Sequence, residues 1–323
     1  MMHRRTLLAT AAVALAAPAL AQAPWPSRPV RLVLPDTPGS GNDTTARLFA
    51  PLLEAALGQP FVIENRGGAG GRIGVEAAYR SAPDGTTFLL GNAGSNGINA
   101  AIYRDLPYDL TNAFDPVSLL VTGPNALIVK PRLLPVASVA ELIATVRARP
   151  GGFNYASAGV GSSAHMNMEL FKSQAGLDIV HVPYRGAPAL VQAVIAGEAP
   201  LAFGNLVNVM PQVRSNEVKL LAVTSMTRLP DLPDTPTVHE SGLPGFETVA
   251  WNGLLAPKGT PAPVRDRLLA ELVKLRPNVQ LADRIRLLGG TLLVSSPAEF
   301  QQRIERDIAQ WKRLATAANI TAQ

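Results

Sequence analysis

The sequence predicts an α/β protein that folds into two lobes joined by a hinge of two chain crossings. Apolar runs typical of strands alternate with helix-length segments, which indicates βαβ units and a parallel or mixed sheet in each lobe. Two such series follow one another, each about 100 residues long. A mainly helical tail closes the chain, and it is too short to form a domain of its own.

The first series begins with a strand expected at Val30–Leu34. A helix over Thr44–Leu57, a strand at Phe61–Glu64, a helix over Ile73–Arg80 and a strand at Thr87–Gly91 complete it. Pro and Gly, 28 and 27 residues in total, stand at nearly every joint, which favours short turns between these elements.

The second series has five expected strands and three expected helices. The strands are Ala126–Val129, Phe153–Ala156, Ile179–Pro183, Leu201–Phe203 and Leu220–Thr224, and the helices are Val139–Ala148, Ala164–Gln174 and Pro188–Ala196. In the tail, apolar residues from Phe300 to Leu314 recur every three or four positions, which predicts an amphipathic helix that starts at Ser296-Pro297.

We expect the tail to pack back on the first lobe. Lobe 1 then comprises residues 22–124 plus 247–323, and lobe 2 comprises residues 125–246. The chain crosses between them near Asn125 and near Glu247. Two lobes joined in this way form a hinge with a cleft.

Residues 1–21 have the pattern of a secretory signal peptide. Arg4 and Arg5 precede an apolar stretch from Leu7 to Ala17, and small residues follow at Ala19-Leu20-Ala21, so we expect cleavage before Gln22. Cleavage after Ala23 also fits the small-residue pattern, but Pro24 would hinder it. The arginine pair leaves both the general and the twin-arginine export routes open.

Composition narrows the function classes. The chain has no cysteine, which excludes disulfides, thiolate metal sites and cysteine nucleophiles. Of the formal charge of +5, two charges belong to Arg4 and Arg5, so the mature chain carries +3 (5 − 2). The basic residues are scattered and aromatic residues make up 5%, so we expect no nucleic-acid binding. These features indicate an exported, soluble protein.

Several polar loops follow the expected strands. They are Thr37–Asp43, Gly91–Gly97, Ala156–His165 and Val182–Gly186, together with Asn205 and Asn208. In open α/β sheets, ligands bind beyond the carboxyl ends of strands. The first loop opens a helix, where unpaired backbone N–H groups favour an anion; alternatively, Asn42 or Asp43 caps this helix. The cap and the ligand can use different N–H groups, so both interpretations stay open.

The sequence gives little support for a dinucleotide, phosphate-loop, metal or catalytic site. Gly159-Val160-Gly161-Ser162-Ser163-Ala164 fits the dinucleotide fingerprint, but Asp178 precedes the next strand instead of ending it. The glycine run Gly67–Gly71 lacks the spacing and the Lys of a phosphate loop. The four histidines show no metal-binding spacing, and no serine lies in a nucleophile elbow. We therefore expect no catalytic residues, no metal and no cofactor.

A series of ordered blocks resembles a known family over essentially the whole mature chain. The blocks include WPSRPVRLVLPDTPGSGND, GQPFVIENRGGAGGRIG, APDGTTFLLG, ASAGVGSSAHMNMELFK, HVPYRGAPAL, LLAVTSMTRLPDLPDTPTVHESGLPGFE and WNGLLAPKGTP. The chain resembles the Bug family, the periplasmic solute receptors of tripartite tricarboxylate transporters. The resemblance implies a Venus-flytrap fold, similar to type II periplasmic binding proteins, that closes over a small carboxylate.

The resemblance also implies where the ligand lies. Backbone groups of Pro38–Asp43 and of Ser157–Ser163 would hold one carboxylate, and Ala93–Asn96 and Tyr184-Arg185 would line the rest of the cleft. The candidate ligand-binding residues are Thr37, Pro38, Gly39, Ser40, Gly41, Asn42, Asp43, Ala93, Ser95, Asn96, Ser157, Gly159, Gly161, Ser162, Ser163, His165, Tyr184, Arg185 and Asn205.

Two departures from the family pattern bear on the ligand. The first loop is usually richer in Phe and Gly, whereas here it reads Asp36-Thr37-Pro38-Gly39-Ser40. Many relatives place Asp after the residue that matches Phe203, where an ammonium group could pair with it; this chain has Gly204. We therefore expect an acid without an amine. Arg185 either grips a carboxylate or faces solvent.

The expected function is delivery of a small organic acid to the membrane permease subunits of a tripartite transporter, by a monomeric receptor. Two alternatives stay open: a ligand sensor that feeds a signalling partner, and an exported α/β enzyme that acts on a small acid.

Overall fold

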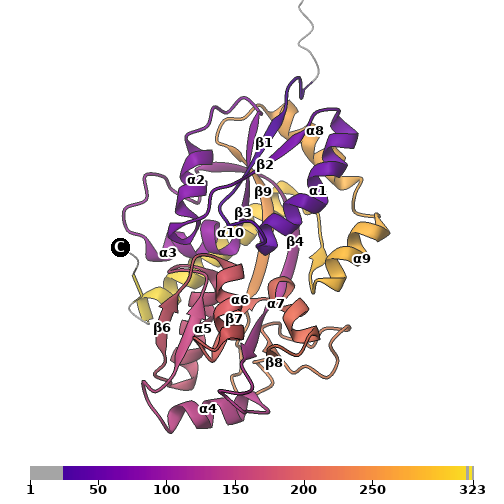
Figure 1. The fold of residues 1–323 in the computed structure, drawn as a ribbon. Helices are drawn as coiled ribbons and strands as arrows, with labels where there is room; N and C mark the ends of the chain where they lie inside the picture. Colours follow the sequence, from indigo (N-terminus) through magenta and orange to yellow (C-terminus); the bar gives the residue numbers. More distant parts are fainter. Residues whose placement is uncertain (1–24, 318–319, 322–323) are drawn as a thin grey trace, which may run out of the picture.

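The computed structural model describes residues 25–317 and 320–321, which form two lobes (Figure 1). The predicted signal peptide, residues 1–21, lies outside the described residues. One lobe contains the elements β1 (Val30–Leu34), α1 (Gly41–Leu57), β2 (Phe61–Asn65), η1 (Ala69–Gly71), α2 (Arg72–Tyr79), β3 (Thr87–Asn92), η2 (Gly94–Ile98) and α3 (Asn99–Ile102).

The middle of the chain builds the other lobe, drawn in magenta to salmon in Figure 1. Its elements are α4 (Val139–Arg147), β5 (Asn154–Ser157), α5 (Ser163–Ala175), β6 (Val180–Pro183), α6 (Ala187–Ala196), β7 (Leu201–Asn205), α7 (Leu206–Arg214) and β8 (Lys219–Val223). The strand β4 (Phe114–Val129) enters this lobe from the first.

The C-terminal elements return to the first lobe. They are β9 (Val249–Pro257), α8 (Ala262–Val273), α9 (Val279–Leu287), β10 (Thr291–Leu292) and α10 (Pro297–Ala317). Leu254, Leu268 and Ile285 from this segment share a buried apolar cluster with Leu32 and Phe49. Trp251 and Phe300 are both buried and meet edge to face, with ring centroids 5.3 Å apart.

One mixed sheet of ten strands runs through both lobes, in the order β2-β1-β3-β9-β4-β7-β5-β6, with β8 and β10 paired to β4. Pairs within each βαβ series are parallel, and pairs that involve β4 or β9 are antiparallel. Along β4, Phe114–Pro124 pairs with β9, and Asn125–Val129 pairs with β7. This long strand therefore ties the two lobes together.

The predicted α/β class with two lobes is confirmed, and β1 has the predicted bounds. Other elements differ from the prediction. Ala126–Val129 is only the end of β4, and β9 was not expected at all. Gly253 interrupts the apolar run of β9, and the Phe300 ring lies where a side chain on this glycine would stand, 2.3 Å from the ideal Cβ position. A glycine that reads as a loop signal in the sequence thus serves helix–sheet packing.

Candidate functional site

A cavity of about 550 Å³ lies between the two lobes. Residues 35–37, 40, 41, 67–71, 92–94 and 103 line it from one lobe. Residues 158–160, 162–164, 184–187, 190, 191, 204, 205 and 208 line it from the other, and Ala250 and Trp251 lie at the crossing between them. Cavities of this size hold small organic molecules in other proteins.

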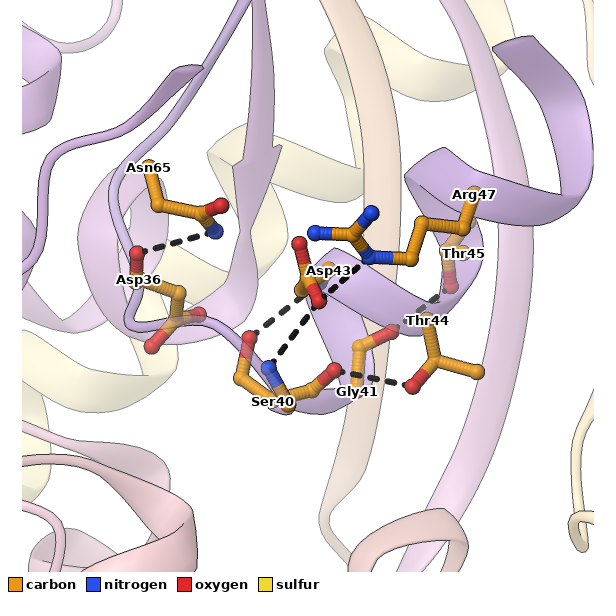
Figure 2. Close-up of polar contacts among 9 residues, drawn as sticks. Asp36, Ser40, Gly41, Asp43, Thr44, Thr45, Arg47 and Asn65 are labelled. Atoms are coloured by element: carbon orange, nitrogen blue, oxygen red, sulfur yellow. Dashed lines mark hydrogen bonds and ion pairs between the residues drawn. The ribbon is translucent and has the colours of Figure 1, made fainter. Parts of the chain in front are cut away.

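The start of α1 lines the cavity at Ser40 and Gly41. Figure 2 shows the polar contacts around this helix start. Ser40 is the N-cap residue, and its Oγ accepts a hydrogen bond from Asp43 N at 3.1 Å. Asp43 accepts from Gly39 N at 2.9 Å and pairs with Arg47 Nε at 2.9 Å. Burial would raise the pKa of Asp43, but these hydrogen bonds hold it below its usual range. Asp43 is therefore ionised, and its carboxylate is already bonded to Arg47 and to the backbone N–H of Gly39.

The start of α5 forms the opposite wall with the same chemistry. Ser162 is its N-cap residue and accepts from His165 N at 3.3 Å. In both helices the serine satisfies the third backbone N–H and leaves the first two without an intrahelical partner. Two helix N-termini, one from each lobe, thus lie on one cavity.

Three of these N–H groups belong to residues that line the cavity, namely Gly41, Ser163 and Ala164. Within the part of the chain that the structure describes, none of the three N–H groups has an acceptor. The partial positive charge of each helix start adds to their attraction for an anion. Thr37 Oγ1, also buried in the cavity wall, has no partner among the described residues.

Two charged side chains line the cavity among the described residues: Asp36 from one lobe and Arg185 from the other. Asn92 Nδ2 donates to Asp36 Oδ2 at 2.8 Å. Burial raises the pKa of Asp36 to about 7, against the lowering effect of hydrogen bonds from Asn42 and Asn92. Arg185 is exposed on the loop after β6.

A pair of stacked histidines supports the loop before α5. The rings of His165 and His181 lie 4.2 Å apart, and His181 Nε2 lies 2.6 Å from Ser157 Oγ. Gly161 N donates to His165 Nδ1 at 3.3 Å. Burial, followed by the neighbouring His165, lowers the pKa of His181 to about 4, so both rings stack in the neutral form at pH 7. These contacts fix the backbone from Ser157 to Gly161.

The two lobes touch around the cavity at glycines. A methyl group on Gly41 would lie 2.7 Å from Val207 Cγ1, and one on Gly161 would lie 2.5 Å from Ile102 Cδ1. One on Gly186 would lie 2.3 Å from Thr37 Oγ1. Each of these positions lets the backbone of one lobe approach a side chain of the other.

The structure brings ten of the predicted site residues to the cavity: Thr37, Ser40, Gly41, Ala93, Gly159, Ser162, Ser163, Tyr184, Arg185 and Asn205. The other nine are not among the residues that line it: Pro38, Gly39, Asn42, Asp43, Ser95, Asn96, Ser157, Gly161 and His165.

Most of these nine make contacts that support the cavity wall instead. The Asn42 side chain donates to Leu90 O, Asp43 pairs with Arg47, and Ser95 bonds Asn92 and Asn96. The N–H groups of Gly39 and Gly161 are used by Asp43 and His165. The expectation that Asn42 or Asp43 caps the first helix is wrong, because Ser40 caps it.

Several residues that line the cavity are not among the predicted site residues. Gly67–Gly71, set aside because it lacks phosphate-loop spacing, lines the cavity beside Asp36 and Asn92. Tyr103 and Trp251 also lie there, whereas Asn208, which lines the cavity too, is among the polar residues expected beyond the strand ends. Gly70 has a left-handed backbone and faces Val160 O across the lobes, a contact that no local pattern reveals.

Among the described residues, no cluster of His, Asp or Glu could hold a metal ion. No helix in that part of the chain is long and apolar enough to cross a membrane.

Comparison with known proteins identifies the family. Residues 45–320 match the family described as the tripartite tricarboxylate transporter family receptor. The chain belongs to this family. Protein BugT of Bordetella pertussis is 32% identical over 302 residues, which cover 93% of this chain and 92% of BugT.

Solved structures of similar proteins superpose closely on this chain. An R. palustris protein solved with adipate has a TM-score of 0.89 and 36% identity, covering 92% of this chain and 99% of its own. MatC from Rhodopseudomonas palustris, with bound malate, has a TM-score of 0.85 and 32% identity, covering 90% and 99%. The periplasmic binding protein BugD has a TM-score of 0.87 and 33% identity, covering 93% and 100%. Because the family and these neighbours are binding proteins, this chain is a receptor and not an enzyme.

Proposed function

We propose that this receptor binds a small organic carboxylate in the cavity between its lobes and delivers it to the membrane permease subunits of a tripartite transporter. The observation that carries the proposal is the pair of serine-capped helix starts, α1 and α5, which face one cavity from opposite lobes. Their free N–H groups at Gly41, Ser163 and Ala164 suit a carboxylate that bridges the lobes.

The relatives support the ligand class. The adipate complex and the malate complex both hold small carboxylates, and both proteins share more than 30% identity with this chain. The cavity of about 550 Å³ admits acids of that size together with bridging water.

Arg185 supplies the positive side chain of the site. It lines the cavity, is exposed, and has no ion-pair partner among the described residues. A guanidinium in this position can hold a carboxylate through two parallel hydrogen bonds.

Ligand binding would stabilise the shut form, since the ligand then contacts both lobes at once. The shut receptor presents a surface composed of both lobes to the permease. The predicted signal peptide supports a periplasmic location for this exchange.

A thermal-shift screen tests the ligand class. We expect mono-, di- or tricarboxylates or amino acids to raise the melting temperature, with about 2.7 kcal/mol of stabilisation at a hundredfold excess over Kd. If only neutral sugars or nucleotides raise the melting temperature, the proposal is contradicted.

Arg185→Gln should weaken binding of the acid that the screen identifies, and the loss should shrink at high salt. Arg132→Gln, a matched change at an exposed residue away from the cavity, should bind as the wild type does. Equal affinity in all three proteins would remove Arg185 from the site. Delivery is tested by uptake: cells that keep the permease but lack this receptor should not import the identified acid.

A further inference from the structure

The charges in the cavity form a balanced pair. Among the described lining residues, Asp36 is the one acidic side chain and Arg185 the one basic side chain. A site for a plain dianion would gain nothing from a carboxylate in its wall, because like charges repel at short range. The presence of Asp36 therefore calls for an explanation in terms of the ligand.

Asp36 lacks a cationic partner of its own. Asn92 Nδ2 donates to Oδ2 at 2.8 Å, and Asn65 Nδ2 reaches only the backbone carbonyl, at 3.3 Å. No ion pair joins the Asp36 carboxyl to any described residue. The neighbouring cation Arg47 points to Asp43, as Figure 2 shows, and bonds it at 2.9 Å.

The loops that carry the two charges touch each other across the cleft. Thr37, the residue after Asp36, packs its side chain against Gly186, the residue after Arg185; a methyl group on Gly186 would lie 2.3 Å from Thr37 Oγ1. Asp36 and Arg185 do not bond to each other, although both line the same cavity. The cleft thus offers a negative and a positive group from opposite lobes, with space for a ligand between them.

We infer that the ligand of this receptor carries a protonated amine as well as a carboxylate, and that Asp36 is the specificity-determining residue that accepts hydrogen bonds from that amine. This inference rests on the proposed function and names the substrate class of the same site. An ammonium supplies both the charge and the N–H donors that a half-buried carboxylate lacks. It also reverses the expectation of an amine-free acid drawn from Gly204, because Asp36 offers the missing acidic group from the other lobe.

Matched ligand pairs test this inference. Aspartate is compared with succinate, and glutamate with glutarate, by isothermal titration calorimetry at pH 8 on the mature full-length receptor. Each pair differs only in the amine. Wild-type receptor should bind the amine-bearing member of at least one pair about ten- to a hundredfold more tightly than its partner.

Two variants assign the preference to one residue. Asp36→Asn should abolish the preference, whereas Asp266→Asn, the same change at an exposed position on α8 outside the cavity, should keep it. Unchanged melting of the ligand-free Asp36→Asn protein, or a higher melting temperature, shows that the loss is not a folding defect.

The outcomes separate the two proposals. If diacids bind as tightly as amino acids, or if Asp36→Asn keeps the preference, this inference is overturned while the carboxylate receptor stands. If no acid binds, with or without an amine, both proposals fall.

Discussion

Asn92 donates a hydrogen bond to the carboxyl of Asp36, with Nδ2 2.8 Å from Oδ2, and both residues line the cavity. The two residues come from neighbouring strands of the sheet, since Asp36 follows β1 and Asn92 ends β3. Amide donors do not replace the hydration that Asp36 loses, and burial accordingly raises the pKa of Asp36 from 3.8 to about 7. Ionised Asp36 therefore destabilises the fold above about pH 7.

Asp36→Asn should stabilise the ligand-free protein at alkaline pH. The folded state favours the protonated carboxyl, so its contribution to stability is full below pH 3.8 and is lost as the pH rises through about 7. The loss amounts to at most about 4 kcal/mol. Chemical denaturation at pH 8 should show the variant about 1 to 3 kcal/mol more stable, with a smaller gain at pH 5. A variant equally destabilised at both pH values contradicts this prediction.

His181 should act in the opposite direction over the same pH range. Its folded pKa, about 4, lies below the unfolded value of 6.5, so its contribution is present above pH 6.5 and is lost as the pH falls through about 4. His181→Phe keeps a ring between Tyr155 and His165, and Ser157 Oγ keeps its bonds to Gly159. Denaturation midpoints at pH 7 and pH 5 should therefore differ less in this variant than in the wild type. If the variant loses as much stability as the wild type between pH 7 and pH 5, or more, His181 is not the cause of the wild type's loss.

The sequence predicted elements whose signals are local. Strand β1 has the predicted bounds, and α10 begins at the predicted Ser296-Pro297 because Ser296 Oγ caps Glu299 N. The cap of α1 also has a local signal, because serine followed three residues later by an acid is typical of a helix start. Ser40 Oγ accepts from Asp43 N, and Asp43 in turn accepts from Gly39 N. The cap predicted at Asn42 or Asp43 is wrong because both residues lie inside the helix, which begins at Gly41.

The remaining errors concern contacts between distant segments. β9 depends on Phe300, 47 positions after Gly253, and the Gly67–Gly71 loop reaches the cavity only because Gly70 meets Val160 of the other lobe. Ten of the nineteen predicted site residues line the cavity, since strand ends and helix starts are local signals. The sequence does not show which way the side chains of Asn42 and His165 point. The prediction therefore includes residues that support the cavity wall from behind as well as residues that line it. The lobe boundaries remain a prediction.

Thr224 should hold the two crossings together. Asn125 N donates to its Oγ1 at 2.8 Å, and the same oxygen donates to Thr248 O at 2.7 Å; all three residues are buried. Thr224→Val removes the hydroxyl at nearly constant volume and leaves both groups unpaired, so unfolding should become about 1 to 3 kcal/mol easier. Thr224→Ser keeps the hydroxyl and should lose clearly less in the same urea titrations. If the valine variant is as stable to urea as the serine variant, water replaces these hydrogen bonds.

Gly161 should control closure without touching the ligand. Its backbone is left-handed, with φ of 79°, and an added methyl group would lie 2.5 Å from Ile102 Cδ1 and 3.0 Å from Asn99 Oδ1 in the other lobe. Gly161→Ala should therefore oppose the shut form and weaken ligand binding about tenfold or more.

Gly58→Ala provides the matched control. Gly58 has a φ of 76°, so alanine meets the same backbone strain, but no atom lies within 4 Å of its ideal Cβ position. Both variants should lose about 1 kcal/mol of stability in denaturant titrations. Calorimetry with the identified acid should then show weak binding by the Gly161 variant alone. Equal affinity in the two variants would mean that the Ile102 contact yields to the extra methyl group and does not govern closure.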